Sequence, residues 1–99
     1  MAEYRLLIHP AAAAEAESVH AWYAERNLSA AAQFLANLDI AIGRILDSPH
    51  RWPRVFGDYR RFILPKFPFS VVYRTVGNEI EVIAIAHHRR RPRYWVGRH

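Results

Sequence analysis

The chain has 99 residues, of which 52% are hydrophobic and 13% aromatic; this excludes a disordered segment and suits one domain spanning residues 1–99. There is no cysteine, which excludes a disulfide framework and a thiolate zinc site, and no apolar run approaches the roughly 20 residues that span a bilayer. The net charge of +5 and a pI near 10.2 indicate an anionic partner, and we expect a cytoplasmic protein that does not enter a membrane.

The first half of the chain predicts one strand and two helices. Residues 3–9 read as a strand, and Pro10 suits the first turn of a helix that continues to about residue 26. Ser29 is the expected N-cap of a second helix, which ends before Pro49. Apolar residues recur at helical spacing in both helices and are expected to meet the core: Ala12, Ala16, Val19, Trp22 and Tyr23, then Phe34, Leu35, Leu38, Ile42, Ile45 and Leu46.

The second half predicts three strands, at residues 60–65, 67–76 and 79–88. Gly77-Asn78 suits a two-residue turn between the last two. Counting outward from that turn places Arg74 opposite Glu81 as a cross-strand ion pair. The same count gives the pairs Val72–Ile83, Ser70–Ile85 and Pro68–His87.

These strands are expected to present one apolar face and one open face. The apolar set, which should meet the helices, is Phe69, Val71, Tyr73, Val82, Ala84 and Ala86. The open face should carry Arg61, Ser70, Arg74 and His87, because Phe62 and Leu64 alternate with Arg61 along their strand. The predicted fold is α+β with the order βααβββ, a helical hairpin packed on one face of a small, mainly antiparallel sheet.

The basic residues gather in the second half, and most densely in the stretch "AHHRRRPRYW" at residues 86–95. Thirteen of the fourteen basic residues are arginine, and residues 51–99 hold ten of them. Arg89, Arg90, Arg91 and Arg93 lie beside aromatic residues; such a cluster can be a solvated chain end, but it also suits phosphate or carboxylate binding, which we expect. Tyr94 and Trp95 are expected to pack the end of the chain back onto the domain.

His87 and His88 are neighbours on a predicted strand. Their side chains therefore leave opposite faces and cannot hold one metal ion together. We expect neither a metal site nor a cofactor. One histidine should cap the sheet edge by hydrogen bonding, while the other faces the open side.

Two segments carry a resemblance to a known family. "RRFILPKFPFSVVYRT" at 60–75 and "IEVIAIAHHRRRPRYW" at 80–95 resemble the RelE/ParE superfamily of bacterial toxins. The first segment has the family's arginine-led strand, its Phe-Pro-aromatic step and a strand that ends in tyrosine. The second has its last apolar strand, which closes with histidine, arginines, proline and tryptophan. The resemblance implies a type II toxin, associated with growth inhibition and plasmid stabilisation, that forms a hetero-oligomer with an acidic antitoxin.

The resemblance leaves two activities open. RelE-like toxins cleave mRNA on the ribosome without a metal, using basic side chains; ParE-like toxins bind and inhibit DNA gyrase. Of the basic positions that the nucleases use, two fall on Arg61 and Arg90, but two fall on Ile63 and Ser70, where the charge is lost. The nuclease tyrosine has no match in register, although Tyr94 is near. These losses favour a ParE-like inhibitor, with an atypical nuclease as the alternative.

The candidate site follows from both readings. For a nuclease, the resemblance implies catalysis by Arg61, His87 and Arg90, and Glu81 or His88 are further candidates for a glutamate–histidine pair. For either activity, the expected binding residues are Arg60, Arg61, Ser70, His88, Arg89, Arg90, Arg91, Arg93 and Tyr94.

Overall fold

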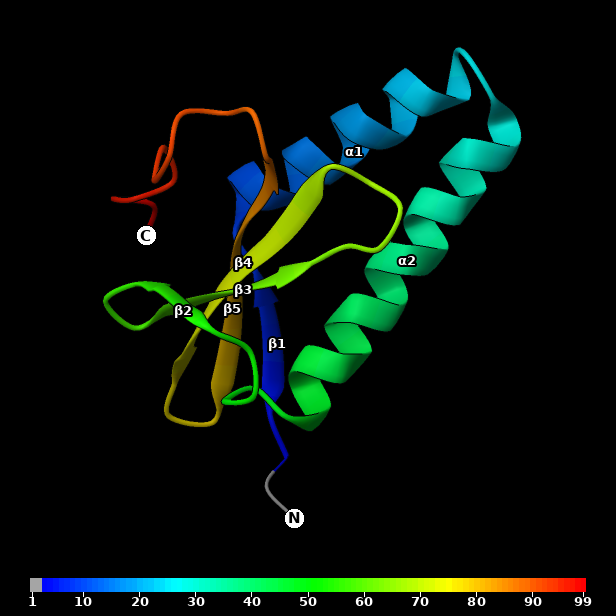
Figure 1. Cartoon of the computed structure of the whole chain (residues 1–99). Helices are drawn as coiled ribbons and strands as arrows, with labels where there is room; N and C mark the ends of the chain where they lie inside the picture. The colour runs from blue at the N-terminus through cyan, green and yellow to red at the C-terminus, as the bar shows by residue number, and fades with distance from the viewer. Residues whose placement is uncertain (1–2) are drawn as a thin grey trace.

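The computed structural model describes residues 3–99 as a helical hairpin lying against one face of a five-stranded sheet (Figure 1). Sheet order is β1-β5-β4-β3-β2, with β1 parallel to β5 and the other neighbours antiparallel. The predicted α+β fold is therefore confirmed. The elements in chain order are β1 (Arg5–Ile8), α1 (Pro10–Ala24), α2 (Leu28–Asp47), β2 (Arg54–Phe56), β3 (Tyr59–Ile63), β4 (Phe69–Val76) and β5 (Glu79–His87).

Strand β2 was not predicted and extends the expected order by one element. It has only three residues, all exposed, and pairs with β3 at the edge of the sheet. So short a strand carries no period-two pattern, and Pro53 and Gly57 on either side read as loop residues. Its importance is positional, because Val55 and Phe56 border the site described below.

The helix termini agree with the sequence at three ends and differ at one. Pro10 opens α1, and α2 ends at Asp47 with Ser48 as its cap, directly before Pro49. The N-cap of α2 is Asn27 and not Ser29, because the Asn27 Oδ1 accepts a hydrogen bond from the Ala30 amide at 3.0 Å. Asparagine and serine are equally good N-caps, so residue type did not separate the two positions.

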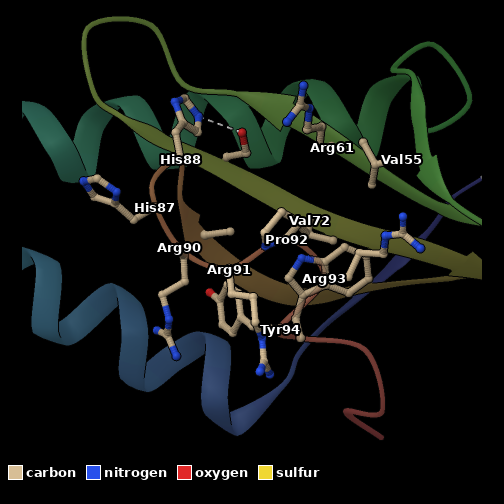
Figure 2. Close-up of a pocket in the computed structure, with 13 residues that line it drawn as sticks. Val55, Arg61, Val72, His87, His88, Arg90, Arg91, Pro92, Arg93 and Tyr94 are labelled. Carbon is tan, nitrogen blue, oxygen red and sulfur yellow. Dashed lines mark hydrogen bonds between the residues drawn. The ribbon is translucent and has the colours of Figure 1, made fainter.

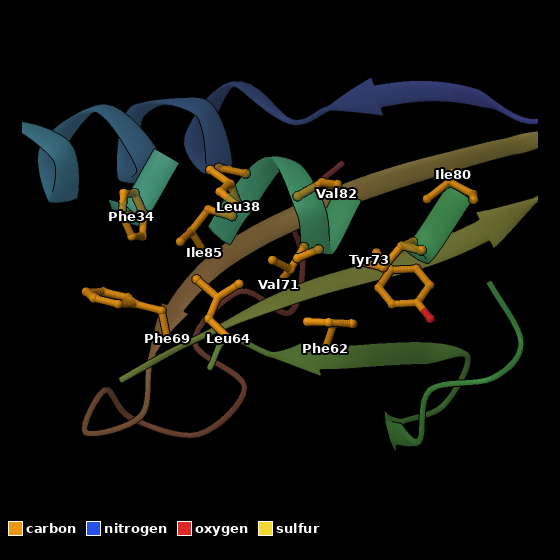
Figure 3. Packing of buried hydrophobic residues seen from close by; sticks show 13 residues of the cluster. Phe34, Leu38, Phe62, Leu64, Phe69, Val71, Tyr73, Ile80, Val82 and Ile85 are labelled. Atoms are coloured by element: carbon orange, nitrogen blue, oxygen red, sulfur yellow. The ribbon is translucent and has the colours of Figure 1, made fainter. Parts of the chain in front are cut away.

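The core lies between the helical hairpin and the sheet (Figure 3). Phe62 and Leu64 of the β3 region are buried there as predicted. Two members of the predicted helical stripes, Trp22 and Leu35, are instead 53% and 41% exposed, because they lie at the margins of those stripes. The core cluster contains Ala12, Phe34, Leu38, Ala41, Ile45, Phe62, Leu64, Phe69, Val71, Tyr73, Ile80, Val82 and Ile85.

The β4–β5 hairpin follows the predicted register only in the half next to the turn. Val76 pairs with Glu79 across the turn, and Arg74 pairs with Glu81, with Arg74 Nη2 2.9 Å from Glu81 Oε1. Gly77 supplies the positive φ of 59° that this tight turn requires. Beyond Tyr73 a β-bulge adds one residue to β5, so that Val72 pairs with Ala84 rather than with Ile83.

This bulge overturns the predicted pairs Val72–Ile83, Ser70–Ile85 and Pro68–His87. The observed pairs are Val72–Ala84, Ser70–Ala86 and Phe69–His87. A one-residue shift exchanges the faces of a strand, so Ala84 and Ala86 lie on the open side and Ile85 joins the core against the helices.

The two histidines exchange places for the same reason. His87 pairs with Phe69, and the two rings meet edge to face with centroids 5.0 Å apart. His88, and not His87, lies beside Ser70 on the open face. The register therefore contradicts the prediction that His87 pairs on the same face as Arg61 and Ser70, although the His87 side chain, at the end of β5, still reaches the pocket described below. A bulge has no sequence signature in this apolar strand.

Candidate functional site

An open pocket of about 340 Å³ lies on the face of the sheet away from the helices (Figure 2). It is formed by β3, β4, the end of β5 and the segment that follows β5. Its apolar surface includes Val55, Val72, Ala86 and Trp95. Its polar surface consists of four arginines, a serine, two histidines and a tyrosine: Arg61, Ser70, His87, His88, Arg90, Arg91, Arg93 and Tyr94.

Arg61 occupies the pocket because of strand alternation. Its neighbour Phe62 is 8% exposed and faces the core, so the Arg61 side chain is left on the open face, as predicted. Glu81, one possible structural partner, is bound to Arg74 instead. Within residues 3–99, no ion pair holds Arg61, so its guanidinium can bind an external anion.

His88 and Ser70 form the one polar pair inside the pocket. Ser70 is 2% exposed, and its Oγ shares a hydrogen bond of 2.9 Å with His88 Nε2 (Figure 2, dashed line). The His88 amide also donates to the Pro68 carbonyl oxygen at 2.9 Å. Backbone and side chain together therefore hold this imidazole at the pocket wall, in the place beside Ser70 that was predicted for His87.

The arginine segment, residues 89–93, is held against the domain by aromatic rings. The Arg90 guanidinium lies 4.0 Å from the Tyr94 ring centroid, and that of Arg93 lies 4.9 Å from the Phe56 centroid. Arg93 has a φ of 59°, an uncommon value for a residue with a side chain, and the chain reverses there. Arg89 is exposed outside the pocket.

Trp95 closes the floor of the pocket and packs the chain end onto the sheet, as predicted. It is 4% exposed and forms a second apolar cluster with Val72, Ile83 and Ala84. Its ring centroid lies 4.9 Å from that of Tyr59. The bulge contributes here, because it turns both Ile83 and Ala84 toward Trp95.

Glu15 of α1 fastens the chain end from the other side. Its carboxylate accepts hydrogen bonds from the Tyr94 hydroxyl at 2.7 Å, from the Ile85 amide at 3.0 Å and from both Nη atoms of Arg98 at 2.9 and 3.0 Å. Arg90 Nη1 lies 3.8 Å from the same group. Burial raises the pKa of Glu15, but the hydrogen bonds from Arg98, Tyr94 and Ile85 outweigh it and bring that pKa below its ordinary value.

Glu15 and Arg98 were not identified as important from the sequence. A signal was present, because Glu15 interrupts an alanine-rich helix beside the apolar residues Ala12, Ala16 and Val19. A carboxylate adjacent to a core-facing stripe requires a buried partner. The distance of 83 residues to Arg98 in the chain hid which partner it was.

Arg60 belongs to a different part of the molecule from the pocket. It faces the helical side, where its Nη1 donates to the carbonyl oxygens of His50 and Trp52 at 3.1 and 2.6 Å. The Tyr73 hydroxyl donates to the Pro49 carbonyl oxygen at 2.6 Å in the same loop. These bonds anchor the connection between α2 and β2, a structural task that the predicted binding role of Arg60 did not include.

The chemistry of the pocket is that of an anion site. Four arginines border it, and no aspartate or glutamate of residues 3–99 does. Guanidinium groups bind carboxylates and phosphates with paired hydrogen bonds, and the apolar floor would accept the non-polar part of the same ligand. A side chain or short segment of a protein partner that combines both properties fits this surface.

Comparison with known proteins agrees with this geometry. Residues 6–92 match the family model for the ParE toxin of the type II toxin–antitoxin system, parDE. Among solved structures, the chain is similar to one of the chromosomal ParDE toxin–antitoxin system from P. aeruginosa, with a TM-score of 0.76 and 19% identity, over 88% of this chain and 98% of that one. No curated protein sequence matches the chain.

A model that covers most of the chain shows the family, and this protein belongs to the ParE toxins of type II toxin–antitoxin systems. It is a type II toxin, whose partner is an antitoxin. Within residues 3–99 no helix is long and apolar enough to span a bilayer.

Proposed function

We propose that this toxin stops growth by binding DNA gyrase and not by cutting RNA. The observation that carries the proposal is the composition of the pocket. It offers four arginines for binding an anion, whereas its two histidines and its tyrosine are each engaged in contacts within the domain.

RNA cleavage by a 2′-hydroxyl needs a base, an acid and stabilisation of the phosphorane charge. His88 and His87 both line the pocket, but His88 is bonded to Ser70, and His87 Nδ1 accepts a hydrogen bond from the Arg89 amide at 3.0 Å. His87 packs on Phe69, and the Tyr94 hydroxyl donates to Glu15. Burial raises the pKa of that hydroxyl further, and the Glu15 hydrogen bond adds to the effect, so Tyr94 is a poor acid and a poor base.

The pocket also has fewer groups to stabilise a phosphorane charge than the RelE-like nucleases have. Ile63 and Ser70 occupy positions that are basic in the RelE-like nucleases, and removal of one charge-stabilising group typically costs about 10²–10³ in rate. Ile63 is a 54% exposed apolar side chain and is not among the residues that line the pocket. A surface with arginines and an apolar floor is suited to binding a protein.

The arginine segment also suits neutralisation by an acidic antitoxin. Arg89, Arg90 and Arg91 are exposed, and bidentate pairs with antitoxin carboxylates would bind tightly. The toxin would then be silent as a hetero-oligomer and active in growth inhibition and plasmid stabilisation once the antitoxin is lost.

The alternative is a ribosome-dependent mRNA endonuclease with an atypical site. One observation favours it, because the three residues suggested for catalysis, Arg61, His87 and Arg90, all border the same pocket. His88 is a second candidate histidine there, with Ser70 orienting its ring at 2.9 Å.

Two assays on one preparation of purified toxin distinguish the two proposed functions. Primer extension on ribosome-bound message should reveal no cuts in A-site codons, whereas supercoiling by gyrase should be inhibited. A RelE-like nuclease serves as the positive control for cleavage. Discrete A-site cuts without inhibition of gyrase would replace the proposed function by the alternative.

A further inference from the structure

Glu15 lies outside the pocket, yet it contacts the chain on both sides of the arginine segment. It accepts from the Ile85 amide on β5, before the segment, and from Tyr94 and Arg98 after it. Its side chain is only 15% exposed. We propose that Glu15 is a positioning residue for the toxin surface, which fixes where the arginines of residues 89–93 stand; this rests on the proposed function of that segment.

Glu15 contacts β5 at a part of its edge where no neighbouring strand pairs with it on the β1 side. Strand β1 pairs with β5 only as far as Ile8 and Val82, so the Ile85 amide lies beyond the last parallel pair. The Glu15 carboxylate satisfies this donor at 3.0 Å. A buried amide without a partner is costly, so helix α1 is tied to the strand directly before the arginine segment.

The contact with the chain end acts on Arg90 through Tyr94. The hydroxyl of Tyr94 is held by Glu15 at 2.7 Å, and the ring of Tyr94 lies 4.0 Å from the Arg90 guanidinium. Arg90 is itself 3.8 Å from Glu15 Oε2, and its side chain is 55% exposed. Arg90 is therefore oriented by a ring and a carboxylate while its outer face stays available to a partner.

The bidentate pair with Arg98 completes the arrangement. Both Nη atoms donate to the two Glu15 oxygens, and Nη1 also donates to the Ile83 carbonyl oxygen at 3.0 Å. The Arg98 side chain is 18% exposed, so solvent competes weakly for these bonds. With β5 and Arg98 both fixed to Glu15, the intervening loop has fewer conformations, and a partner loses less entropy on binding it.

Three substitutions in the full-length toxin test this role. Glu15→Gln keeps the size of the side chain but removes the charge and one of the two strong acceptors. Arg98→Gln breaks the same pair from the chain end. Glu17→Gln, on an exposed position of the same helix, is the matched control. For each variant, hydrogen exchange of residues 88–98 is followed by mass spectrometry, and growth inhibition is scored at matched expression.

We expect Glu15→Gln to raise exchange in residues 88–98 by about tenfold, with α2, β3 and β4 unchanged. Growth inhibition should weaken, and the Glu15→Gln/Arg98→Gln double variant should be no worse than either single one. Glu17→Gln should behave as wild type. If Glu15→Gln melts far below wild type, Arg98→Gln gives the same test from the less buried chain end.

Unchanged exchange of residues 88–98 in folded Glu15→Gln would overturn the proposal. So would faster exchange with full toxicity, provided that Arg89→Ala/Arg90→Ala/Arg91→Ala has lost toxicity. If that triple variant is also fully toxic, the arginine segment is not needed for toxicity. The proposed function of the segment then fails together with the positioning role of Glu15.

Discussion

Ile63 of β3 lies directly opposite Ser70 of β4 in the sheet. In the resemblance to the RelE-like nucleases, these are the two positions where a basic residue is replaced by a neutral one, so both replacements fall on one cross-strand pair. Ser70 is buried and bonded to His88, while Ile63 is half exposed as an apolar side chain. Ile63 and Ser70 therefore form one neutral patch beside a pocket that Arg61 and Arg90 make basic.

Arg61 is the residue in which the two readings of the pocket meet. Arg61→Ala should abolish growth inhibition while changing the free energy of unfolding by no more than about 0.5 kcal/mol, because the side chain is exposed and unpaired within residues 3–99. Arg44→Ala, an exposed arginine on α2, is the control and should remain toxic. A thermal melt beside a toxicity plate measures both. A stable, fully toxic Arg61→Ala protein would remove Arg61 from the site.

The arginine segment should carry the contact with the antitoxin. Changing Arg89, Arg90 and Arg91 to alanine together removes three guanidinium groups that can pair with carboxylates, so affinity for the acidic product of the neighbouring gene should fall by at least about tenfold. Titration calorimetry against that product would measure the loss, with Arg44→Ala again as control. An antitoxin that binds the triple variant as tightly as wild type has its main contacts elsewhere.

The cross-strand pair of Arg74 and Glu81 should matter for stability alone. Its side chains are 29% and 20% exposed, and it lies outside the pocket lining. Arg74→Ala should lower the free energy of unfolding by about 0.5–1 kcal/mol and leave toxicity intact. Denaturant unfolding checks the first expectation, and a growth assay the second. Loss of toxicity in a folded Arg74→Ala protein would extend the functional surface toward the hairpin turn.

Glu15 should give the fold a dependence on acid. Its pKa in the folded chain lies below the ordinary 4.5, so its ionised form is favoured by folding. This contribution is complete above the unfolded pKa and is lost as the pH falls through the folded one. Near neutral pH, the free energy of unfolding of Glu15→Gln should be about 1–3 kcal/mol lower than that of wild type. This difference should shrink as the pH falls below 4.5 and through the lower pKa of Glu15 in the folded chain.

The matching measurement is denaturant unfolding of both proteins across that range, with Glu17→Gln in parallel. A gap that does not change between neutral and acid pH would mean that the Glu15 charge adds nothing to stability, and that only its shape matters.

The sequence was sufficient for the layers of the fold because periodicity reports which face is buried. The helical stripes, the alternation around Arg61 and the turn at Gly77 all led to the observed arrangement. It was insufficient for the end of β5, since "VIAIA" is apolar on both faces and does not reveal that Ile83 and Ala84 share one side. One added residue there decided that His88, rather than His87, bonds to Ser70, while both histidines line the pocket.

The sequence predicted those site residues that a local sequence pattern identifies. It did not predict the contacts between segments that are far apart in the chain. Arg61, Ser70 and Arg90 were identified from the resemblance, and all three line one pocket. The bonds of Arg60 to the His50 and Trp52 carbonyls, and of Glu15 to Arg98, join segments whose approach only the folded chain defines. Backbone acceptors in particular have no residue-type signature.

The most direct measurement for the proposed function is a gyrase supercoiling assay with purified wild-type toxin, Arg61→Ala and Arg44→Ala, each with and without the antitoxin. If the toxin acts by binding gyrase, wild type and Arg44→Ala inhibit supercoiling, Arg61→Ala does not, and the antitoxin restores activity. Gyrase that is fully active in the presence of folded wild-type toxin, at concentrations that saturate the antitoxin, would contradict the account.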